Sequence, residues 1–396
     1  MQIDLIGIGM EGHATLTEDA RLAIAQADLL IGARRMLDAV PVDERARFYA
    51  YDPKEIAEYL ACSKATHAAV LLSGDVGFFS GAKGLLEALK GHALRLIPGI
   101  SSAVYFCAKL AIPWENMKFV SLHGTDNRVA VHAAAHHRTF FLLGGAMTAA
   151  HICERLCEYG LENVRVHIGS RLGYPDEQII SAPASELCGC KAGSLSVMVV
   201  ENPDFTDYLP TCIPDEEFIR GAVPMTKSVV RGASVASLQI GKNAVCWDVG
   251  CGSGSISVEM ALRCPDGHVY AIDKAPEAIA LSGRQSRKFH CDNITVLEGS
   301  APSALPALPA PDAVFIGGSS GSITEIFDVI WQKNPDAHIA VNAVTLETLH
   351  AAQAAFYAHG GSCNITQLAV TSARNIGSST MLQAHNPVFM LQGKLR

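Results

Sequence analysis

The chain has 396 residues, of which 49% are hydrophobic and 18% are charged, and its formal net charge is -8. This length and this apolar content predict two or more domains with well-filled cores. The acidic balance disfavours a protein that binds nucleic acid through its phosphates, because such proteins usually carry a basic surplus.

The N-terminus and the cysteines indicate the compartment. The sequence MQIDLIGIG has no basic region ahead of its apolar residues, and no apolar stretch reaches the roughly 18 residues of a membrane span. The 12 cysteines are scattered, and the close pairs Cys153/Cys157 and Cys188/Cys190 lack the second half of a zinc site. We therefore expect a cytoplasmic protein with reduced cysteines, no membrane contact and no bound metal.

The first half of the chain alternates short apolar strands with helices. Loops follow the carboxyl ends of several strands, and three of these loops are rich in glycine: GIGMEG at 7–12, SGDVGFFS at 73–80 and PGISS at 98–102. This alternation predicts an α/β layer fold. The expected strands span 3–8, 28–31, 68–72, 94–97, 119–122, 139–143, 164–169 and 194–200, and the expected helices include 51–61 and 149–159.

A resemblance to the tetrapyrrole (corrin and sirohaem) methylase family is carried by five segments: IDLIGIGMEG, LLSGDVGFFS, LIPGISSAVYFCAKLAIPW, VSLHG and IGSRLGYPDEQI. The resemblance implies a two-lobed α/β fold that binds S-adenosylmethionine in the cleft between its lobes. The family usually has GxGPG in the first loop and GDP in the second, whereas Met10, Glu11 and Val76 stand here. Helix capping is the alternative role for the two serines of PGISS. The implied cofactor contacts are Gly74, Asp75, Val76, Gly77, Ser101 and Ser102.

Between the halves lies a polar, proline-bearing stretch at 206–223, which predicts a linker between domains at 1–205 and 224–396. Upstream, His132, His136 and His137 are close in sequence and could suggest a metal site. No acidic residues match them, so we interpret these histidines as the solvated face of a polar helix.

The sequence AVCWDVGCGSGS at 244–255 predicts a strand, a tight glycine turn and the start of a helix. Glycine lets the backbone turn sharply and lets a ligand approach it closely. Asp273 ends the next strand, about 20 residues past the turn, where a carboxylate can accept ribose hydroxyls. The pattern DxGxGxG differs from the GxGxxG of NAD enzymes and resembles motif I of the S-adenosylmethionine methyltransferases. The predicted cofactor site comprises Gly250, Cys251, Gly252, Ser253, Gly254 and Asp273, together with Thr226 at a helix start and Ser300 and Ala301 beside the adenine.

Further strands are expected at 294–297, 313–316, 339–341, near 367–371 and at 388–392. With the two strands already described, they predict a seven-stranded, Rossmann-like methyltransferase fold. The phrases PDEEFIRG, PMTK, WDVGCGSGSISVE, YAID, VFIGGSSG and NAVTLET resemble the decarboxylating precorrin methyltransferases.

The two resemblances, in this order, imply the bifunctional decarboxylating C5,15-methyltransferase family of cobalamin (vitamin B12) synthesis. The N-terminal domain would methylate C5 of precorrin-6Y or a cobalt-precorrin. The C-terminal domain would methylate C15 and remove the carboxyl of the ring-C acetate. The family also implies one S-adenosylmethionine site per domain and a homo-oligomer. No pair of residues in the sequence identifies itself as a catalytic acid and base.

A tetrapyrrole substrate carries many carboxylates, so an acidic protein must present local cations to it. Solvated surface charge is the alternative role for each cation. The loop after the fourth strand of the C-terminal domain contains small residues that leave room for a broad planar ligand. The candidate substrate residues are Lys227, Arg231, Arg34, Arg35, Arg171, Gly317, Gly318 and Asn342.

Two other functions remain open from the sequence. An RNA methyltransferase is the first, although the sequence IGGSS at 316–320 replaces the (D/N)PP(Y/F) motif that stacks a target base in amino-directed enzymes. Retention on RNA that depends on salt would favour it. The second is a sensor that binds S-adenosylmethionine without turnover, but sensing requires only one such site.

Overall fold

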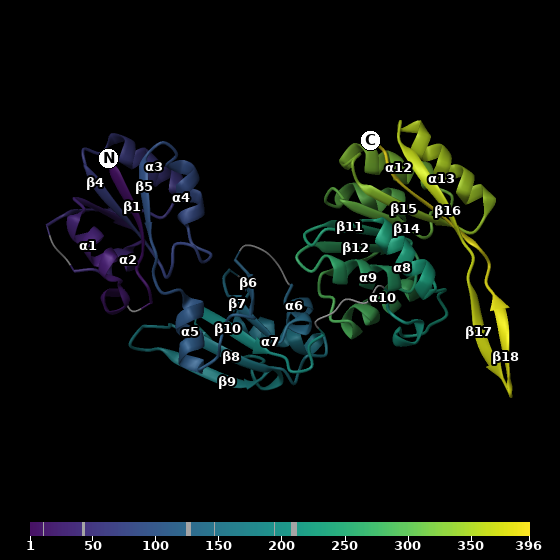
Figure 1. Ribbon diagram of the computed structural model, residues 1–396, viewed down its shortest axis with the longest axis horizontal. Coiled ribbons are helices and arrows are strands. Elements are labelled where there is room, and N and C mark those ends of the chain that lie inside the picture. Colours follow the sequence, from purple (N-terminus) through teal and green to yellow (C-terminus); the bar gives the residue numbers. More distant parts are fainter. Residues whose placement is uncertain (11, 42–43, 124–127, 146, 194, 207–211) are drawn as a thin grey trace. The chain divides into compact units, whose positions relative to one another are not determined.

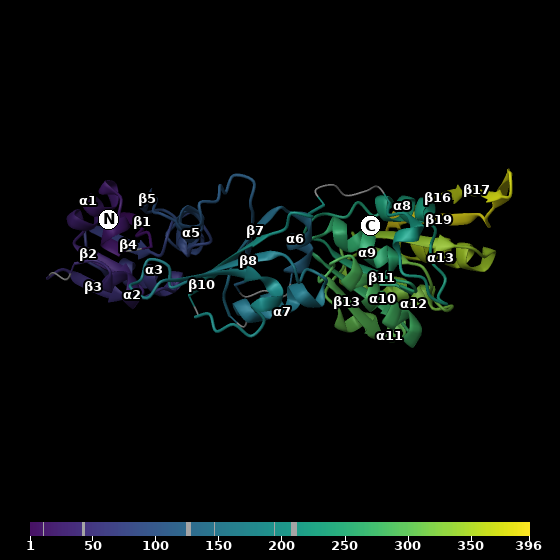
Figure 2. The same cartoon turned by 90° about the horizontal axis from the view of Figure 1, so that it is seen from below.

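The computed structural model describes residues 1–10, 12–41, 44–123, 128–145, 147–193, 195–206 and 212–396 (Figure 1 and Figure 2). None of the helices in these ranges combines the length and the apolar character needed to cross a bilayer. The chain divides into two compact units that are not contiguous in sequence. Unit 1 comprises Met1–Asp126, Arg138–Ile152 and Val164–Glu201, and unit 2 comprises Asn127–His137, Cys153–Asn163 and Asn202–Arg396.

The first sheet of unit 1 is parallel throughout, with the strand order β3-β2-β4-β1-β5. Alternate residues of β1 enter different cores: Ile3 and Leu5 pack with α3 and α4, whereas Ile6 packs with α1 and α2. A parallel sheet covered by helices on both faces requires such continuously apolar strands. The elements are β1 (Gln2–Gly7), α1 (Glu18–Gln26), β2 (Leu29–Gly32), α2 (Arg34–Asp38), β3 (Ala46–Tyr49), α3 (Pro53–Cys62), β4 (His67–Leu72), α4 (Ala82–Ala88) and β5 (Ala93–Ile97).

The second sheet of unit 1 is mixed, with the order β6-β7-β10-β8-β9. Only β6 and β7 are parallel to each other, and the other neighbours are antiparallel. Phe106 of α5 packs with Phe140 of β7 and Val199 of β10 in the core of this lobe. The elements are α5 (Ser102–Leu110), β6 (Lys118–Ser121), β7 (Arg138–Leu142), β8 (Arg165–Ser170), β9 (Gln178–Pro183) and β10 (Ser196–Glu201), with α6 (Ala130–Ala135) and α7 (Ala149–Glu158) between them in sequence.

The start of α6 is held within unit 2 by the buried carboxylate of Asp292. Its Oδ2 accepts hydrogen bonds from the N–H groups of Val129 (2.7 Å) and Ala130 (2.8 Å), and its Oδ1 accepts one from Val131 (3.0 Å). Burial raises the pKa of Asp292 to about 6, and these N–H groups oppose that rise. The carboxylate supplies the acceptor that a helix N-terminus needs.

The predicted solvated face is wrong for His132, because this side chain is only 2% exposed. Its Nε2 lies 3.2 Å from Asp266 Oδ1 within unit 2. His136 is half-buried and His137 is exposed. The sequence shows polar residues here but does not show which element covers them.

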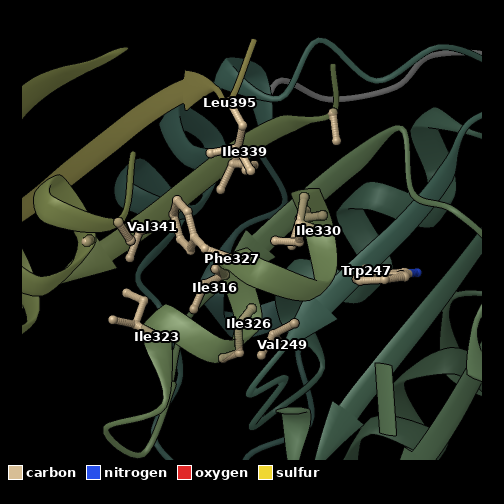
Figure 3. Close-up of a cluster of buried hydrophobic side chains, with 14 of the residues drawn as sticks. Trp247, Val249, Ile316, Ile323, Ile326, Phe327, Ile330, Ile339, Val341 and Leu395 are labelled. Carbon is tan, nitrogen blue, oxygen red and sulfur yellow. The ribbon is translucent and has the colours of Figure 1, made fainter. Parts of the chain in front are cut away.

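Unit 2 contains a seven-stranded sheet with the order β13-β12-β11-β14-β15-β19-β16, in which β19 runs antiparallel to its neighbours β15 and β16. Trp247 and Val249 of β11 belong to the same buried apolar cluster as Phe327 of α12, and Figure 3 labels all three. Cys246 faces the opposite cluster, with α8 and α9. The elements are α8 (Ser228–Ser237), β11 (Val245–Val249), α9 (Ser255–Arg263), β12 (His268–Asp273), α10 (Pro276–Lys288), β13 (Ile294–Glu298), α11 (Ala301–Ala304), β14 (Ala313–Ile316), α12 (Ile323–Lys333), β15 (His338–Ala343), α13 (Leu346–Ala358), β16 (Ser362–Leu368) and β19 (Val388–Lys394).

Two parts of unit 2 differ from the expectation. A separate antiparallel ribbon, β17 (Thr371–Ile376) and β18 (Ser379–Ala384), projects between β16 and β19 (Figure 1), and every one of its strand residues is exposed. Part of the predicted linker is also structured, because Ile213 and Phe218 are buried in the unit 2 core. The stretch 207–211 of that linker lies outside the described residues.

We predict that Asp292→Ala destabilises unit 2 by about 2–4 kcal/mol, because three N–H groups at the start of α6 lose a buried acceptor. Hydrogen–deuterium exchange over 129–135 should accelerate, and the unfolding midpoint in urea should fall. Asp336→Ala, at an exposed aspartate of the same unit, is the control. Unchanged exchange at α6 would contradict the prediction.

Candidate functional site

Three loops of unit 1 meet at the carboxyl ends of β1, β4 and β5. Gly9 and Gly74 form an isolated antiparallel bridge, with N–O distances of 3.0 and 3.2 Å. A Cβ atom at Gly99 would lie 2.3 Å from the carbonyl oxygen of Gly74 and 2.5 Å from that of Gly7. The three backbones therefore touch, and a side chain at Gly99 would force them apart.

Asp75 and Ser101 fix the shape of these loops. Asp75 Oδ1 accepts a hydrogen bond from the N–H of Gly77 (2.8 Å), and Oδ2 accepts one from the N–H of Gly99 (3.1 Å). Ser101 Oγ accepts the N–H of Val104 (3.2 Å) and caps α5. The capping role considered for this serine is therefore present, and both side chains support the backbone that surrounds the site.

These loops form part of the wall of a cavity of about 240 Å³ in unit 1. The rest of the wall comes from the second sheet and the loops that follow its strands. The cavity brings together residues of both kinds that the sequence singled out, namely glycine-loop residues and cations. Gly74, Asp75, Ser101, Ser102, Arg35 and Arg171 line it, together with His123, Tyr174 and apolar residues that include Phe78, Phe79 and Leu172.

Arg171 presents its guanidinium beside this cavity. Its Nε lies 2.5 Å from Asp176 Oδ2, and its guanidinium carbon lies 4.6 Å from the centre of the Tyr174 ring. The contact with Asp176 raises the pKa of the Arg171 guanidinium, and the contact with Arg171 lowers the pKa of the Asp176 carboxyl. The side chain remains 42% exposed, so it can still meet a carboxylate from solution.

In unit 2, the predicted glycine turn connects β11 to α9. Gly250, Gly252 and Gly254 have φ values of 73°, 53° and 76°, the left-handed region that favours glycine. A Cβ at Gly250 would lie 2.6 Å from the carbonyl oxygen of Gly318, which follows β14. Cys251 and Ser253 are 6% and 3% exposed, so the side chains between the glycines point into the protein and the turn offers a ligand its backbone.

Asp273 lies beside this turn at the end of β12. Its Oδ2 accepts the N–H of Gly252 (2.9 Å), and its Oδ1 accepts the N–H of Ala275 (3.0 Å). The residue is half-buried. A carboxylate has further lone pairs after two such bonds, so Asp273 can still accept hydroxyl groups.

Beneath the turn, Asp248 is fully buried. Its Oδ2 accepts the hydroxyl of Ser257 in α9. Burial raises the pKa of Asp248 to about 7, and the bond from Ser257 opposes that rise.

The expectation that Arg231 binds substrate is corrected by its burial, because the side chain is 0% exposed. Its guanidinium bonds to Glu259 Oε1 (2.7 Å), Asp215 Oδ1 (3.1 Å) and the carbonyl oxygen of Thr226 (2.6 Å). It also lies over the ring of Phe218, at 4.5 Å from the centroid. Arg231 therefore anchors the 213–218 segment and the start of α8.

The other predicted residues of unit 2 take different positions. Lys227 precedes α8, is 49% exposed and has its Nζ 3.8 Å from Asp215 Oδ2. Asn342 is half-buried, and its Nδ2 donates a hydrogen bond to Ser234 Oγ (2.9 Å). Gly317 and Gly318 are exposed after β14, and Ser300 and Ala301 are the N-cap and first residue of α11.

Comparisons with known proteins match each half of the chain to a different family of methyltransferases. Residues 2–188 match the family model for tetrapyrrole (corrin/porphyrin) methylases, and residues 217–394 match that for the precorrin methyltransferase domain. A probable cobalt-precorrin-6B C(15)-methyltransferase (decarboxylating) from Pyrobaculum calidifontis is 37% identical over 46% of this chain and 96% of the relative. The chain belongs to the decarboxylating precorrin methyltransferase family.

Two further proteins are similar to parts of this chain. A precorrin-6Y C(5,15)-methyltransferase (decarboxylating) from Sinorhizobium is 28% identical over 87% of this chain and 85% of the relative. A crystal structure of a precorrin-6y C5,15-methyltransferase from Geobacter metallireducens is 34% identical, with a TM-score of 0.44, and the match covers 47% of this chain and 97% of that one. The Sinorhizobium match spans both halves of the chain.

We predict that Asp248 makes unit 2 less stable as the pH rises. Its native pKa of about 7 exceeds the unfolded value of about 3.9, so the native state retains a proton that the unfolded state releases. Between pH 4 and pH 7 this group should lower the free energy of unfolding by up to about 1.4 kcal/mol per pH unit.

Asp248→Asn should remove this component, and urea unfolding of both proteins at each pH gives the difference. Asp336→Asn, at an exposed position, is the matched control. A difference between wild type and Asp248→Asn that does not change with pH would contradict the prediction.

Proposed function

We propose that this chain uses S-adenosylmethionine to methylate C5 and C15 of a reduced tetrapyrrole and removes the ring-C acetate carboxyl as carbon dioxide. The substrate is precorrin-6Y or a cobalt-precorrin, and the reaction belongs to cobalamin synthesis. Unit 1, with a two-lobed tetrapyrrole methylase fold, performs the C5 methylation. Unit 2, with a Rossmann-like methyltransferase fold, performs the C15 methylation and the decarboxylation.

The proposal rests on two observations. Each half matches a different methylase family model, and each half contains loops whose backbones touch at glycines. The two loop contacts also lie in separate compact units. A sensor requires only one cofactor site, so two sites favour two methyl transfers on one substrate.

The residues of unit 1 fit an S-adenosylmethionine site in their chemistry. Gly74 and Ser102 bring loop backbone to the cavity wall, and Phe78 and Phe79 supply apolar surface. Asp75 and Ser101 are bonded to the backbone of these loops and so help to hold the loops in shape. In unit 2, the backbone at Gly250 and Gly252 would hold the donor while Asp273 would accept its ribose hydroxyls.

When bound, S-adenosylmethionine supplies a sulfonium methyl that is electrophilic enough to alkylate carbon directly. The chain therefore has to hold the nucleophilic carbon in line, and such positioning contributes up to roughly 7–11 kcal/mol. Arg171 and Lys227, both partly exposed, would bind carboxylates of the substrate. Removal of water from the ring-C acetate would favour the loss of carbon dioxide.

The proposal is tested by incubating the full chain with the precursor and S-adenosylmethionine and weighing the products. We expect two added methyl groups and the loss of one carbon dioxide, with S-adenosylhomocysteine formed in proportion. A chain that binds the donor but transfers no methyl group would contradict the proposal.

Two glycine variants should separate the activities. Gly99→Ala places a Cβ against the backbone of Gly74 and Gly7, and Gly250→Ala places one against Gly318. We predict that Gly99→Ala lowers C5 methylation about a hundred-fold and spares the chemistry at C15, and that Gly250→Ala does the reverse.

Each glycine variant should keep the activity of the unit that was not changed, and that remaining activity shows that the rest of the chain is folded. Gly193→Ala and Gly241→Ala are matched controls, because a Cβ at either position meets no atom within 4 Å. If either glycine variant lost both activities equally, the assignment of one activity to each unit would be wrong.

A further inference from the structure

We propose that His123 is the proton acceptor of the C5 methylation, an inference that rests on the proposed function of unit 1. His123 lines the unit 1 cavity at the carboxyl end of β6. The same cavity wall includes the glycine loops on which the cofactor site of this unit is proposed.

The reaction at C5 requires a base on chemical grounds. A bridging carbon of a tetrapyrrole carries one hydrogen. When this carbon attacks the donor, the C5–CH₃ bond forms, the sulfur–methyl bond breaks, and its electron pair stays on sulfur. C5 then holds both the methyl group and its original hydrogen. Loss of that hydrogen as a proton, with its bonding electrons returned to the macrocycle, restores the conjugation.

The other titratable groups among the described lining residues are unsuited to accept this proton. Arg35 and Arg171 are cations whatever the pH of the assay. A proton on Asp75 would disrupt the hydrogen bonds that its two carboxylate oxygens accept from the N–H groups of Gly77 and Gly99, and these bonds shape the glycine loops. Tyr174 is a phenol, a weak base near neutrality, and the Arg171 guanidinium lies over its ring. An imidazole accepts protons in the neutral range, and it is the commonest general base in enzymes.

The backbone at Gly144 holds the imidazole of His123 in place. A Cβ at Gly144, just after β7, would lie 2.0 Å from His123 Nδ1 and 2.2 Å from its Cε1. The ring therefore rests directly against the main chain at Gly144, where only a glycine leaves room for it. The side chain itself is exposed, so the ring is positioned while a substrate can reach it.

The test uses His123→Gln, which removes the imidazole but keeps a polar side chain at this position. We expect His123→Gln to slow C5 methylation about a hundred-fold or more. It should leave the methylation and decarboxylation at C15 unchanged in the same chain. The affinity for S-adenosylhomocysteine, measured by calorimetry with Gly250→Ala closing the unit 2 site in both proteins, should not change.

Two further measurements separate proton transfer from a structural role. His123→Ala should regain C5 methylation when imidazole is added to the buffer. In His123→Gln, a substrate with deuterium at C5 should react more slowly than the protium form, because proton removal becomes the slow step. Gly144→Ala should also impair C5 methylation, because it displaces the ring.

A C5 rate in His123→Gln within about two-fold of the wild type would overturn the assignment of His123. A matching loss of affinity for S-adenosylhomocysteine would overturn it as well, since the imidazole would then serve the donor. These outcomes differ from failure of the proposed function, in which the wild-type chain itself adds no methyl group at C5.

Discussion

Direct contact between backbones at the carboxyl edges of the sheets is the constraint on which both candidate sites depend. In unit 1, the loops at Gly7, Gly74 and Gly99 approach so closely that a single methyl group would separate them. In unit 2, Gly250 meets Gly318 in the same way. A parallel sheet brings the ends of neighbouring strands to one edge, and glycine lets the loops there pack without side chains. The result is a surface of main-chain groups that a small ligand can approach.

Buried charged groups hold several elements of unit 2 in place. Arg231 and Glu259 form an ion pair in which both side chains are at most 1% exposed, and it joins α8, α9 and the 213–218 segment. Asp292 supplies the acceptor for the first turn of α6. Such groups are costly to bury alone, so each is stable only while its partners stay in place. These buried groups therefore determine where the 213–218 segment and α6 attach to the core of unit 2.

The chemistry proposed for the chain requires few reactive side chains. An activated methyl donor and an electron-rich macrocycle leave the protein to position carbon, exclude water and remove one proton. This division of labour agrees with a cavity lined by residues of the glycine loops, apolar side chains, two arginines and one histidine. It also explains why no catalytic pair could be recognised in the sequence.

Local patterns were sufficient to predict much of the fold. The α/β class, the strand at Val245–Val249, the turn that follows it and the position of Asp273 beside that turn follow from apolar runs and glycine spacing within about 30 residues. Motifs at fixed spacing also led to the family. The ribbon of β17 and β18 was missed because its exposed strands bury no face and so lack the alternation that marks a half-buried strand.

The tertiary structure alone decided which residues meet across long stretches of chain. Asp292 lies 163 residues from Val129, and no local pattern connects them. Nothing in the sequence distinguishes Arg231 from a surface cation, yet its side chain is buried in a hydrogen bond with Glu259, 28 residues away. His123 became a candidate only when the structure placed it in the wall of the same cavity as the glycine loops of the first sheet. Apolar periodicity reports which side of an element is buried, whereas the identity of its partner depends on packing between segments that the chain brings together only when it folds.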